Sequence, residues 1–97
     1  MPAVVWRARA LGDVQAIVGK ISAGSRRGAE KLLRTVAAQA ALLGTHPHIG
    51  RAGREAGTRE LVVHRHYAMI YKVAGNRVYI LRILHTSRQW PKPGPGR

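Results

Sequence analysis

The spacing of apolar and polar residues changes several times along this chain, and β-type spacing occurs at its start and in its last third. A short apolar run with two β-branched residues predicts a first strand over residues 3–6. Strand composition returns over residues 58–64, 67–73 and 77–84, and turn-forming residues at 74–76 separate the last two runs. The run 67–73 alternates larger with smaller or polar residues, which predicts one buried and one partly wet face. The run 77–84 is apolar on both faces, so it predicts a central strand.

Between the first strand and the later ones, apolar residues recur at spacings of three and four, which predicts two amphipathic helices. The first stripe consists of Leu11, Val14, Ile17 and Ile21, and the second of Leu32, Leu33, Val36, Ala37, Ala40 and Leu43. Ser25 is a candidate N-cap for the second helix because its hydroxyl can accept from a free backbone N–H of the first turn. Gly44 lies where a left-handed C-cap residue is expected. The short connection between the stripes predicts a helical hairpin.

Two segments carry little core-forming sequence. Residues 45–57 contain a His-Pro-His triplet, three glycines and two arginines, which predicts a mobile loop with little packing. Residues 92–97 contain no core-forming residue, so we expect a disordered tail after a single domain at residues 1–91. The 97 residues of the chain suffice for one domain and are too few for two.

The order strand, helix, helix, strand, strand, strand predicts an α+β fold. We expect a small, mostly antiparallel sheet of order β-α-α-β-β-β with the helical hairpin packed on one face. The opposite face of the sheet is then the expected place for function.

The charge of the chain indicates an anionic partner. Seventeen Lys and Arg residues against four acids give a net charge of +13, and thirteen of the basic residues are arginine. This excess favours RNA, DNA, a ribosome or an acidic protein as partner, whereas the alternative is that arginine serves as a general solvated surface residue. The absence of cysteine excludes disulfides and thiol chemistry. No apolar run is long enough for a signal peptide or a membrane span, so we expect a cytoplasmic protein without a membrane partner.

Several residues on or near the predicted strands could carry phosphodiester cleavage: Arg59, Glu60, Arg82, His85 and Arg88. This reaction needs a base for a 2′-hydroxyl, an acid for the leaving oxygen and guanidinium groups for the phosphorane charge. His85 or Glu60 could fill the first two roles, and Arg82 or Arg88 the third. The structural alternative is that Arg82 pairs with Glu60 or Glu30, while Arg59 and Glu60 point to opposite faces of one strand.

Two His-x-His pairs, His46 with His48 and His64 with His66, invite comparison with metal sites. Neither pair has a third ligand at a clear spacing, and Pro47 and Arg65 separate the partners. We therefore expect histidines exposed in turns, and neither a metal nor another cofactor.

Six features follow one another over residues 4–91: an apolar first strand, a helical hairpin, a His-Pro loop with Gly-Arg, the segment 57–61, the pattern Tyr67-x-x-x-Tyr71-x-Val73, and the ending Ile83-Leu84-His85-x-x-Arg88-x-Trp90. This order resembles the RelE/ParE superfamily of small bacterial toxins. The resemblance implies a toxin of a type II toxin–antitoxin module, neutralised by a cognate antitoxin that wraps it. It also implies that operator DNA is contacted only through the antitoxin complex.

The resemblance implies two possible targets. RelE-like toxins cut mRNA in the ribosomal A site, whereas ParE-like toxins poison DNA gyrase and are not nucleases. RelE-like members typically place an arginine after the first tyrosine of the strand at Tyr67, where this chain has Ala68, and they commonly end with a tyrosine that this Pro/Gly tail lacks.

The resemblance therefore favours a ParE-like toxin acting on DNA gyrase, with a ribosome-dependent mRNA endonuclease as the alternative. For the endonuclease, the catalytic residues would be His85, Arg88 and Arg82, since Arg88 falls where a RelE-like catalytic arginine lies. For either toxin, we expect partner contacts through Arg59, Glu60, Tyr67, Arg82 and Trp90.

Overall fold

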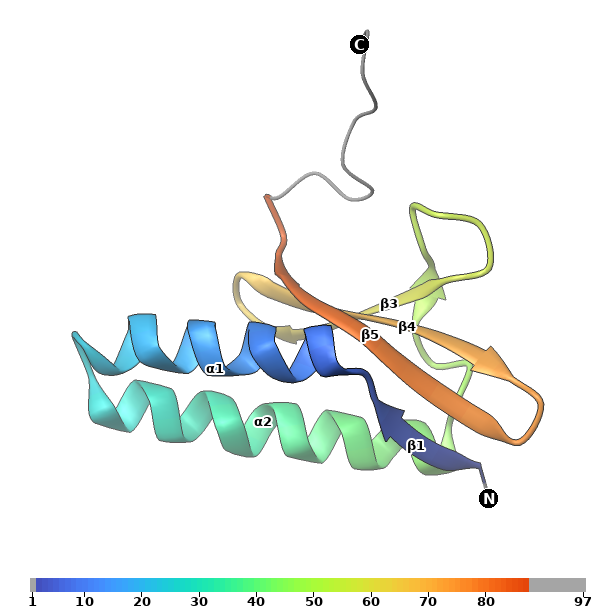
Figure 1. Cartoon of the computed structure of the whole chain (residues 1–97), viewed down its shortest axis with the longest axis horizontal. Coiled ribbons are helices and arrows are strands. Elements are labelled where there is room, and N and C mark those ends of the chain that lie inside the picture. The colour runs from blue at the N-terminus through green and yellow to red at the C-terminus, as the bar shows by residue number, and fades with distance from the viewer. Residues whose placement is uncertain (1, 88–97) are drawn as a thin grey trace, which may run out of the picture.

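The computed structural model describes residues 2–87, which form two helices and a five-stranded sheet (Figure 1). In chain order the elements are Ala3–Trp6 (β1), Ala8–Ser22 (α1), Arg26–Thr45 (α2), Arg51–Ala52 (β2), Arg59–His64 (β3), Tyr67–Ala74 (β4) and Arg77–His85 (β5). The predicted α+β class is confirmed, and the short β2 adds one strand to the predicted order. The predicted disordered tail at 92–97 lies outside the described residues.

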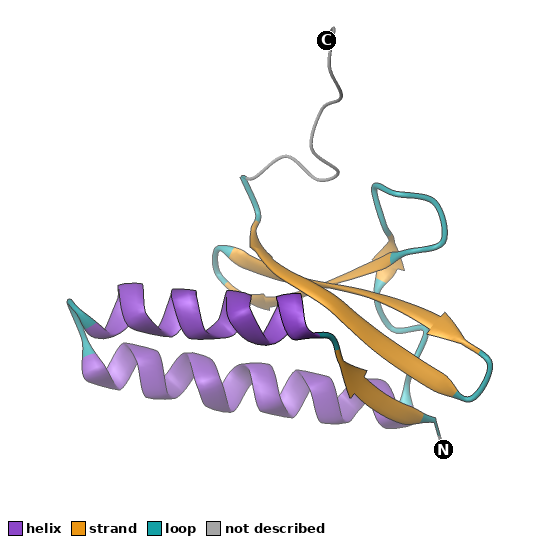
Figure 2. Cartoon of the chain, viewed as in Figure 1, coloured by secondary structure: helices purple, strands orange, loops and turns teal. Residues whose placement is uncertain are grey.

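The strands form one mixed sheet in the order β1-β5-β4-β3-β2. β1 runs parallel to β5, and every other neighbouring pair is antiparallel. β5 has a strand on each side, as its two apolar faces predict. Figure 2 shows α1 and α2 side by side along one face of the sheet. We call the opposite face of the sheet the outer face.

The core lies between the helical pair and the sheet. Its largest buried side chains come from α2, β4 and β5: Leu32, Leu43, Met69, Tyr71, Ile80 and Ile83. Two residues of the predicted second stripe lie outside it, because Leu33 is 43% exposed and Ala37 is exposed as well. Each follows a buried residue by one position, which is a rotation of about 100° around the helix axis. The observed stripe is therefore narrower than the sequence suggested.

The ends of α2 fit one cap prediction and contradict the other. The Ser25 hydroxyl accepts from the Gly28 backbone N–H at 2.9 Å, so the predicted N-cap is confirmed. Gly44 is not a left-handed C-cap, because α2 continues through it and only Gly57 and Gly75 have positive φ among the described residues. A Cβ on Gly44 would lie 3.6 Å from the Val4 side chain, which is an ordinary van der Waals distance, so the packing of α2 against β1 does not require a glycine here.

Residues 45–57 pack more tightly than a mobile loop would. β2 pairs with β3, and the buried Gly50 donates its backbone N–H to the Tyr71 hydroxyl at 2.8 Å. Arg59 holds the same segment by donating to the carbonyls of His48 and Gly50, at 3.2 and 2.7 Å. Burial raises the pKa of Tyr71, and the Gly50 N–H and the Arg59 charge only partly offset this, so the hydroxyl stays protonated at neutral pH. The prediction of little packing in this segment is wrong.

Candidate functional site

The outer face carries a row of three residues across its centre. Glu60 on β3 lies opposite Ile70 on β4, which in turn lies opposite Arg82 on β5. The register of β4 and β5 shifts between Ile70 and Tyr71, so Leu81 is the extra residue of a bulge. Ile70 and Ala68 are both buried on this face, so the predicted partly wet side of β4 is dry there. The charged residues of the row flank an apolar centre.

Arg82 is bound to an acid from the first helix. Asp13 on α1 accepts from Arg82 Nε at 2.8 Å and from Nη2 at 2.9 Å, and it also accepts from the Ile83 backbone N–H at 3.0 Å. β1 pairs with β5 only as far as Ile80, so this carboxylate satisfies a backbone donor at the unpaired edge of β5. The hydrogen bonds that Arg82 donates to Asp13 raise the pKa of Arg82 against the opposing effect of burial. The expected ion-pair partner, Glu60 or Glu30, is therefore wrong, and Asp13 takes its place.

Glu60 is also held by cations, from the segment that leads into β3. It is 3% exposed, and its Oε2 accepts from both the backbone N–H and the Nε of Arg54 at 3.0 Å. Arg51 Nη2 lies 3.6 Å from Oε1. Burial alone would raise the pKa of the Glu60 carboxyl, but the hydrogen bonds and charges of Arg54 and Arg51 hold it below the ordinary value. Glu60 therefore fastens the β2–β3 connection to the outer face.

Replacing Glu60 by glutamine tests this fastening through its pH dependence. We expect a loss of about 1.5–3 kcal/mol in the free energy of unfolding at pH 7, because hydrogen bonds to a charged group are lost. The folded pKa lies below the ordinary value of 4.5, so the contribution of this carboxylate is present above that pH and disappears as the pH falls through the folded pKa. Urea unfolding of the wild-type and Glu60→Gln proteins from neutral to acidic pH measures whether their free energies of unfolding converge as the pH falls. Glu30→Gln is the control, since its carboxylate meets Arg26 at 3.4 Å on an exposed helix face. A Glu60→Gln deficit that stays constant with pH would contradict the assignment.

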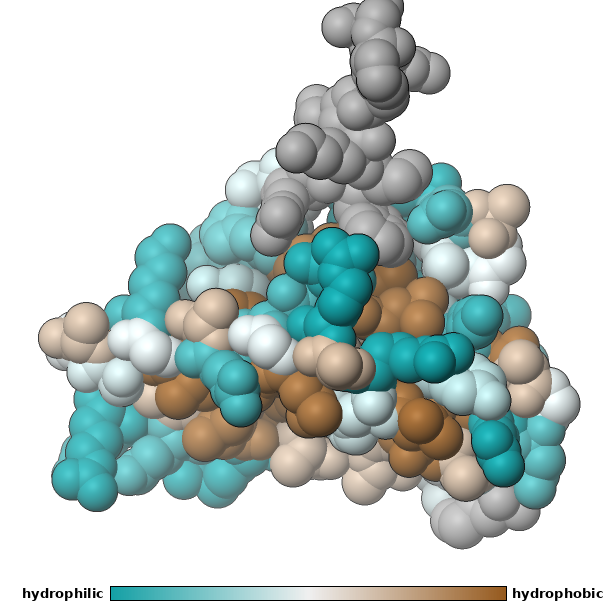
Figure 3. All heavy atoms as spheres, in the orientation of Figure 1, coloured by the Kyte–Doolittle hydropathy of each residue, from teal (hydrophilic) through white to brown (hydrophobic). Residues whose placement is uncertain are grey.

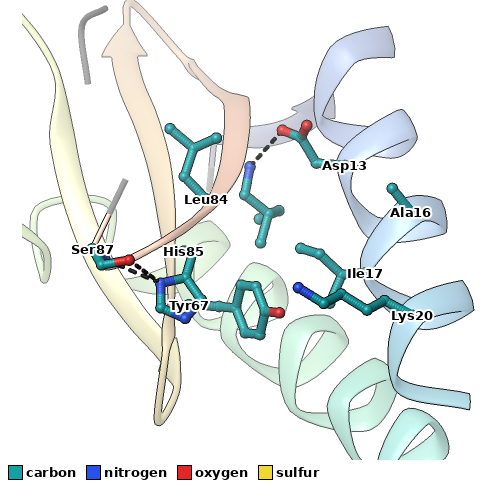
Figure 4. Close-up of a pocket in the computed structure, with 9 residues that line it drawn as sticks. Asp13, Ala16, Ile17, Lys20, Tyr67, Leu84, His85 and Ser87 are labelled. Atoms are coloured by element: carbon teal, nitrogen blue, oxygen red, sulfur yellow. Dashed lines mark hydrogen bonds between the residues drawn. The ribbon is translucent and has the colours of Figure 1, made fainter. Parts of the chain in front are cut away.

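A pocket of about 440 Å³ lies between α1 and the end of β5. Figure 4 shows Lys20 of α1 extending toward the hydroxyl end of Tyr67, with His85 and Ser87 on the strand side. The Ser87 backbone N–H donates to His85 Nδ1 at 3.1 Å, and Ser87 Oγ lies 2.7 Å from the same atom. A backbone N–H can only donate, so Nδ1 is the acceptor and the neutral ring carries its proton on Nε2. His85 is therefore oriented by its own chain.

Aromatic rings gather beside this pocket. His66 stacks on His85 with ring centroids 5.4 Å apart and planes 9° apart, and Tyr67 meets His85 edge-on at 5.4 Å. His66 is exposed in a turn, as predicted, and so are His46 and His48 near the end of α2. His64 departs from the prediction because it lies half-buried on β3 against Tyr67. Within residues 2–87, no group of three His, Cys, Asp or Glu residues is placed to hold a metal ion.

A second pocket, of about 450 Å³, lies where the start of α1 meets β5. It is lined by Arg7, Ala8, Arg9, Glu55, Leu81 and Arg82. The Arg7 guanidinium lies 4.8 Å from the centroid of the Tyr79 ring, which is a cation–π arrangement. The sequence analysis missed Arg7, Lys20 and Asp13 as site residues. The scarcity of acids was the available signal for Asp13, because each of four carboxylates in so basic a chain has many candidate partners.

The residues predicted to act together do not share one surface. Arg59 lies in the row of Tyr71 and Ile80, which face the helices, whereas Arg82 lies on the outer face. Tyr67 and His85 line the pocket beside α1, with Tyr67 packed against the core. Glu60 and Arg82 are adjacent across β4 but are each bound to other charges. Arg88 and Trp90 lie outside the described residues.

The chain is similar to known toxins over nearly its whole length. Residues 4–90 match the family described as "ParE toxin of type II toxin-antitoxin system, parDE". The chain is 39% identical over 88 residues to "Toxin RelE2" of Caulobacter vibrioides, covering 91% of this chain and 99% of that protein. It is 31% identical over 88 residues to "Putative toxin Y4kP" of Sinorhizobium fredii, covering 90% and 91% of the two chains.

A solved structure described as "Chromosomal ParDE TA system from P. aeruginosa" has the same fold, with a TM-score of 0.79 at 24% identity. The similarity covers 90% of this chain and 98% of that one. The family match begins at the second residue of β1 and runs past the end of β5, so it covers all the strands and helices described above apart from Ala3. The chain belongs to the ParE toxin family of type II toxin–antitoxin systems, within the RelE/ParE superfamily.

Proposed function

We propose that this toxin is ParE-like and inhibits DNA gyrase in the cytoplasm by protein–protein contact. As a type II toxin it has a cognate antitoxin partner, and we expect operator DNA to be bound only through their complex. The observation that carries the proposal is the pairing of the charged groups at the centre of the outer face. Its two central charged groups are neutralised within the fold, Arg82 by Asp13 and Glu60 by Arg54.

This neutralisation argues against cleavage chemistry on the outer face. A nuclease needs a guanidinium already directed at the position where the phosphorane charge develops, but the Arg82 guanidinium is directed at a carboxylate in a bidentate contact. Ala68, at the position where RelE-like toxins typically carry an arginine, is buried and contributes no charge. A surface of this kind suits recognition of a protein better than cleavage of RNA.

No helix within residues 2–87 is both long and apolar enough to cross a membrane.

The proposal predicts inhibition in a purified gyrase supercoiling assay. We expect micromolar toxin to block supercoiling or to trap cleaved DNA, and we expect a prior incubation with the cognate antitoxin to prevent it. Heat-unfolded toxin at the same concentration controls for nonspecific effects of a basic chain on DNA. Full supercoiling activity in the presence of folded toxin would contradict the gyrase assignment.

One relative and one pocket favour a second candidate, a ribosome-dependent mRNA endonuclease. The relative is the similar protein named Toxin RelE2, and the pocket places His85 near Lys20 and Tyr67. If gyrase is unaffected, primer extension on mRNA after induction distinguishes this candidate. Cuts at codon boundaries that disappear in His85→Ala or Arg88→Ala would establish cleavage, and intact message would remove it.

A further inference from the structure

A straight basic stripe runs along α2 on the side away from the core. Arg27, Lys31 and Arg34 are four and three residues apart, so they lie within about 60° of one another around the helix axis. Leu32 and Val36, which are buried in the core, lie on the opposite side of the same helix. The three cations are exposed and span about 10 Å along the axis at 1.5 Å per residue.

The stripe lies on a part of the molecule that projects beyond the sheet. Figure 1 shows that the end of α1 and the start of α2 extend past the strands. Figure 3 shows hydrophilic side chains gathered at this end of the helical pair. An extended partner can therefore reach the stripe without meeting the β-sheet or its two pockets.

The cations of the stripe make no ion pair within the described part of the chain. Asp13 binds Arg82, Glu60 binds Arg54 and Arg51, and Glu30 meets Arg26. Among residues 2–87, Arg27, Lys31 and Arg34 make no hydrogen bond, ion pair or ring contact. Their charge is thus directed to solvent, which suits a polyanion with regularly spaced charges.

The position of Arg27 also opposes the intrinsic stability of the helix. α2 has no acidic residue in its first turn, where the helix dipole favours negative charge. Arg26 and Arg27 occupy that turn instead. Arg26 gains a carboxylate from Glu30, whereas Arg27 gains nothing within the described fold. A cation that opposes the dipole of its own helix points to a role in binding.

We propose that the stripe of Arg27, Lys31 and Arg34 binds the phosphate backbone of duplex DNA. The inference deepens the proposed function, on which it rests: the toxin would contact the DNA that gyrase holds while another surface meets the enzyme. Contacts to phosphates carry no sequence information, so the interaction is independent of base sequence and is separate from specific recognition of the operator, which we expect only through the antitoxin complex. Duplex DNA is the polyanion that accompanies gyrase, which is why it is favoured over RNA or an acidic protein.

The test compares two pairs of substitutions that remove equal charge. Arg27→Gln with Arg34→Gln alters the stripe. Arg65→Gln with Arg77→Gln alters two exposed arginines elsewhere, one in the β3–β4 turn and one at the start of β5. The full-length toxin is titrated onto a short fluorescein-labelled duplex without gyrase, from about 50 to 200 mM salt, and anisotropy gives the affinity. We expect the stripe pair to reduce the slope of log affinity against log salt by about 2, and the control pair by less than about 1. The melting temperature of the stripe pair should be unchanged or slightly higher, because a cation is removed from the first turn.

Two outcomes would overturn the proposal. An equal reduction of the salt slope in the stripe pair and the control pair would mean that binding depends on the net charge of the protein and not on the stripe. Tighter binding to single-stranded or duplex RNA of the same length, lost in the stripe pair, would assign the stripe to RNA. Because this titration contains no gyrase, duplex binding can succeed even if wild-type toxin fails to inhibit supercoiling, so the two proposals fail separately.

Discussion

Replacing Asp13 by alanine will lower the free energy of unfolding by about 3–5 kcal/mol, because it removes the carboxylate that binds a guanidinium in a buried position. Arg82 is 8% exposed, and its guanidinium makes two hydrogen bonds to this carboxylate. The backbone N–H of Ile83 loses its acceptor in the same change. Urea unfolding followed by the fluorescence of Trp6, which packs partly buried against the core, measures the loss.

Two further variants separate charge burial from a general effect of helix substitution. Glu30→Ala removes an exposed ion pair with Arg26 and should change stability by at most about 1 kcal/mol. Asp13→Leu combined with Arg82→Met replaces the buried pair by apolar groups and should recover most of the stability. An Asp13→Ala protein as stable as the wild type would show that the ion pair does not secure β5 to α1.

The same variants resolve the role of Arg82 in toxicity. Arg82→Ala alone leaves the partly buried Asp13 carboxylate without the guanidinium that neutralises it, so lost activity in that variant could reflect unfolding rather than chemistry. The double variant keeps the fold without the guanidinium. Growth arrest by the double variant would remove Arg82 from any catalytic set, and its loss in a stably folded protein would support a direct role.

Periodicity predicted the elements of this fold because each one has a local cause. The apolar stripes, the Ser25 cap and the two apolar faces of β5 depend on residues close in sequence. The cap and the central position of β5 are confirmed, and so are the stripes apart from Leu11, Leu33 and Ala37, which are exposed. Leu33 belongs to the predicted apolar stripe but is exposed, because hydrophobicity alone does not determine which edge of a stripe meets the sheet. The fold class therefore followed from the sequence, and the edges of the stripes did not.

The candidate site was less predictable because its contacts join distant parts of the chain. Asp13 and Arg82 lie 69 residues apart, so no spacing rule connects them. Helical spacing places Asp13 off the apolar stripe of the first helix and says nothing about its partner. The acids considered as partners of Arg82 are Glu60 and Glu30. Only the position of α1 at the unpaired edge of β5 selects the correct acid.

The composition of the segment at 45–57 predicts loose packing because glycines are common in flexible turns. A Cβ on Gly50 would lie 2.6 Å from the Tyr71 hydroxyl and 2.8 Å from the Glu60 carbonyl oxygen. Gly50 is therefore required by close approach to a buried side chain. This requirement comes from Tyr71, which is distant in sequence. Composition alone therefore cannot distinguish a glycine needed for close packing from a glycine in a flexible turn.

Replacing Gly50 by alanine should accordingly destabilise the protein by about 2–4 kcal/mol, from overpacking and from loss of a buried hydrogen bond. Tyr71 is fully buried and the Glu60 oxygen belongs to the backbone of β3, so neither can move aside cheaply. The segment must shift instead, which breaks the bond from the Gly50 N–H to the Tyr71 hydroxyl. Urea unfolding gives the change in stability, and faster proteolysis near residue 50 would locate it.

Gly12→Ala is the matched control, and its effect should have the opposite sign. A Cβ on Gly12 meets nothing within 4 Å, and the residue lies inside α1, so alanine should stabilise by about 0.5–1 kcal/mol through helix propensity. Adding Tyr71→Phe to Gly50→Ala removes the nearest clashing oxygen, so the two substitutions together should cost less than the sum of their separate effects. A neutral Gly50→Ala, or strictly additive losses in the double variant, would mean that the segment does not rest on Tyr71.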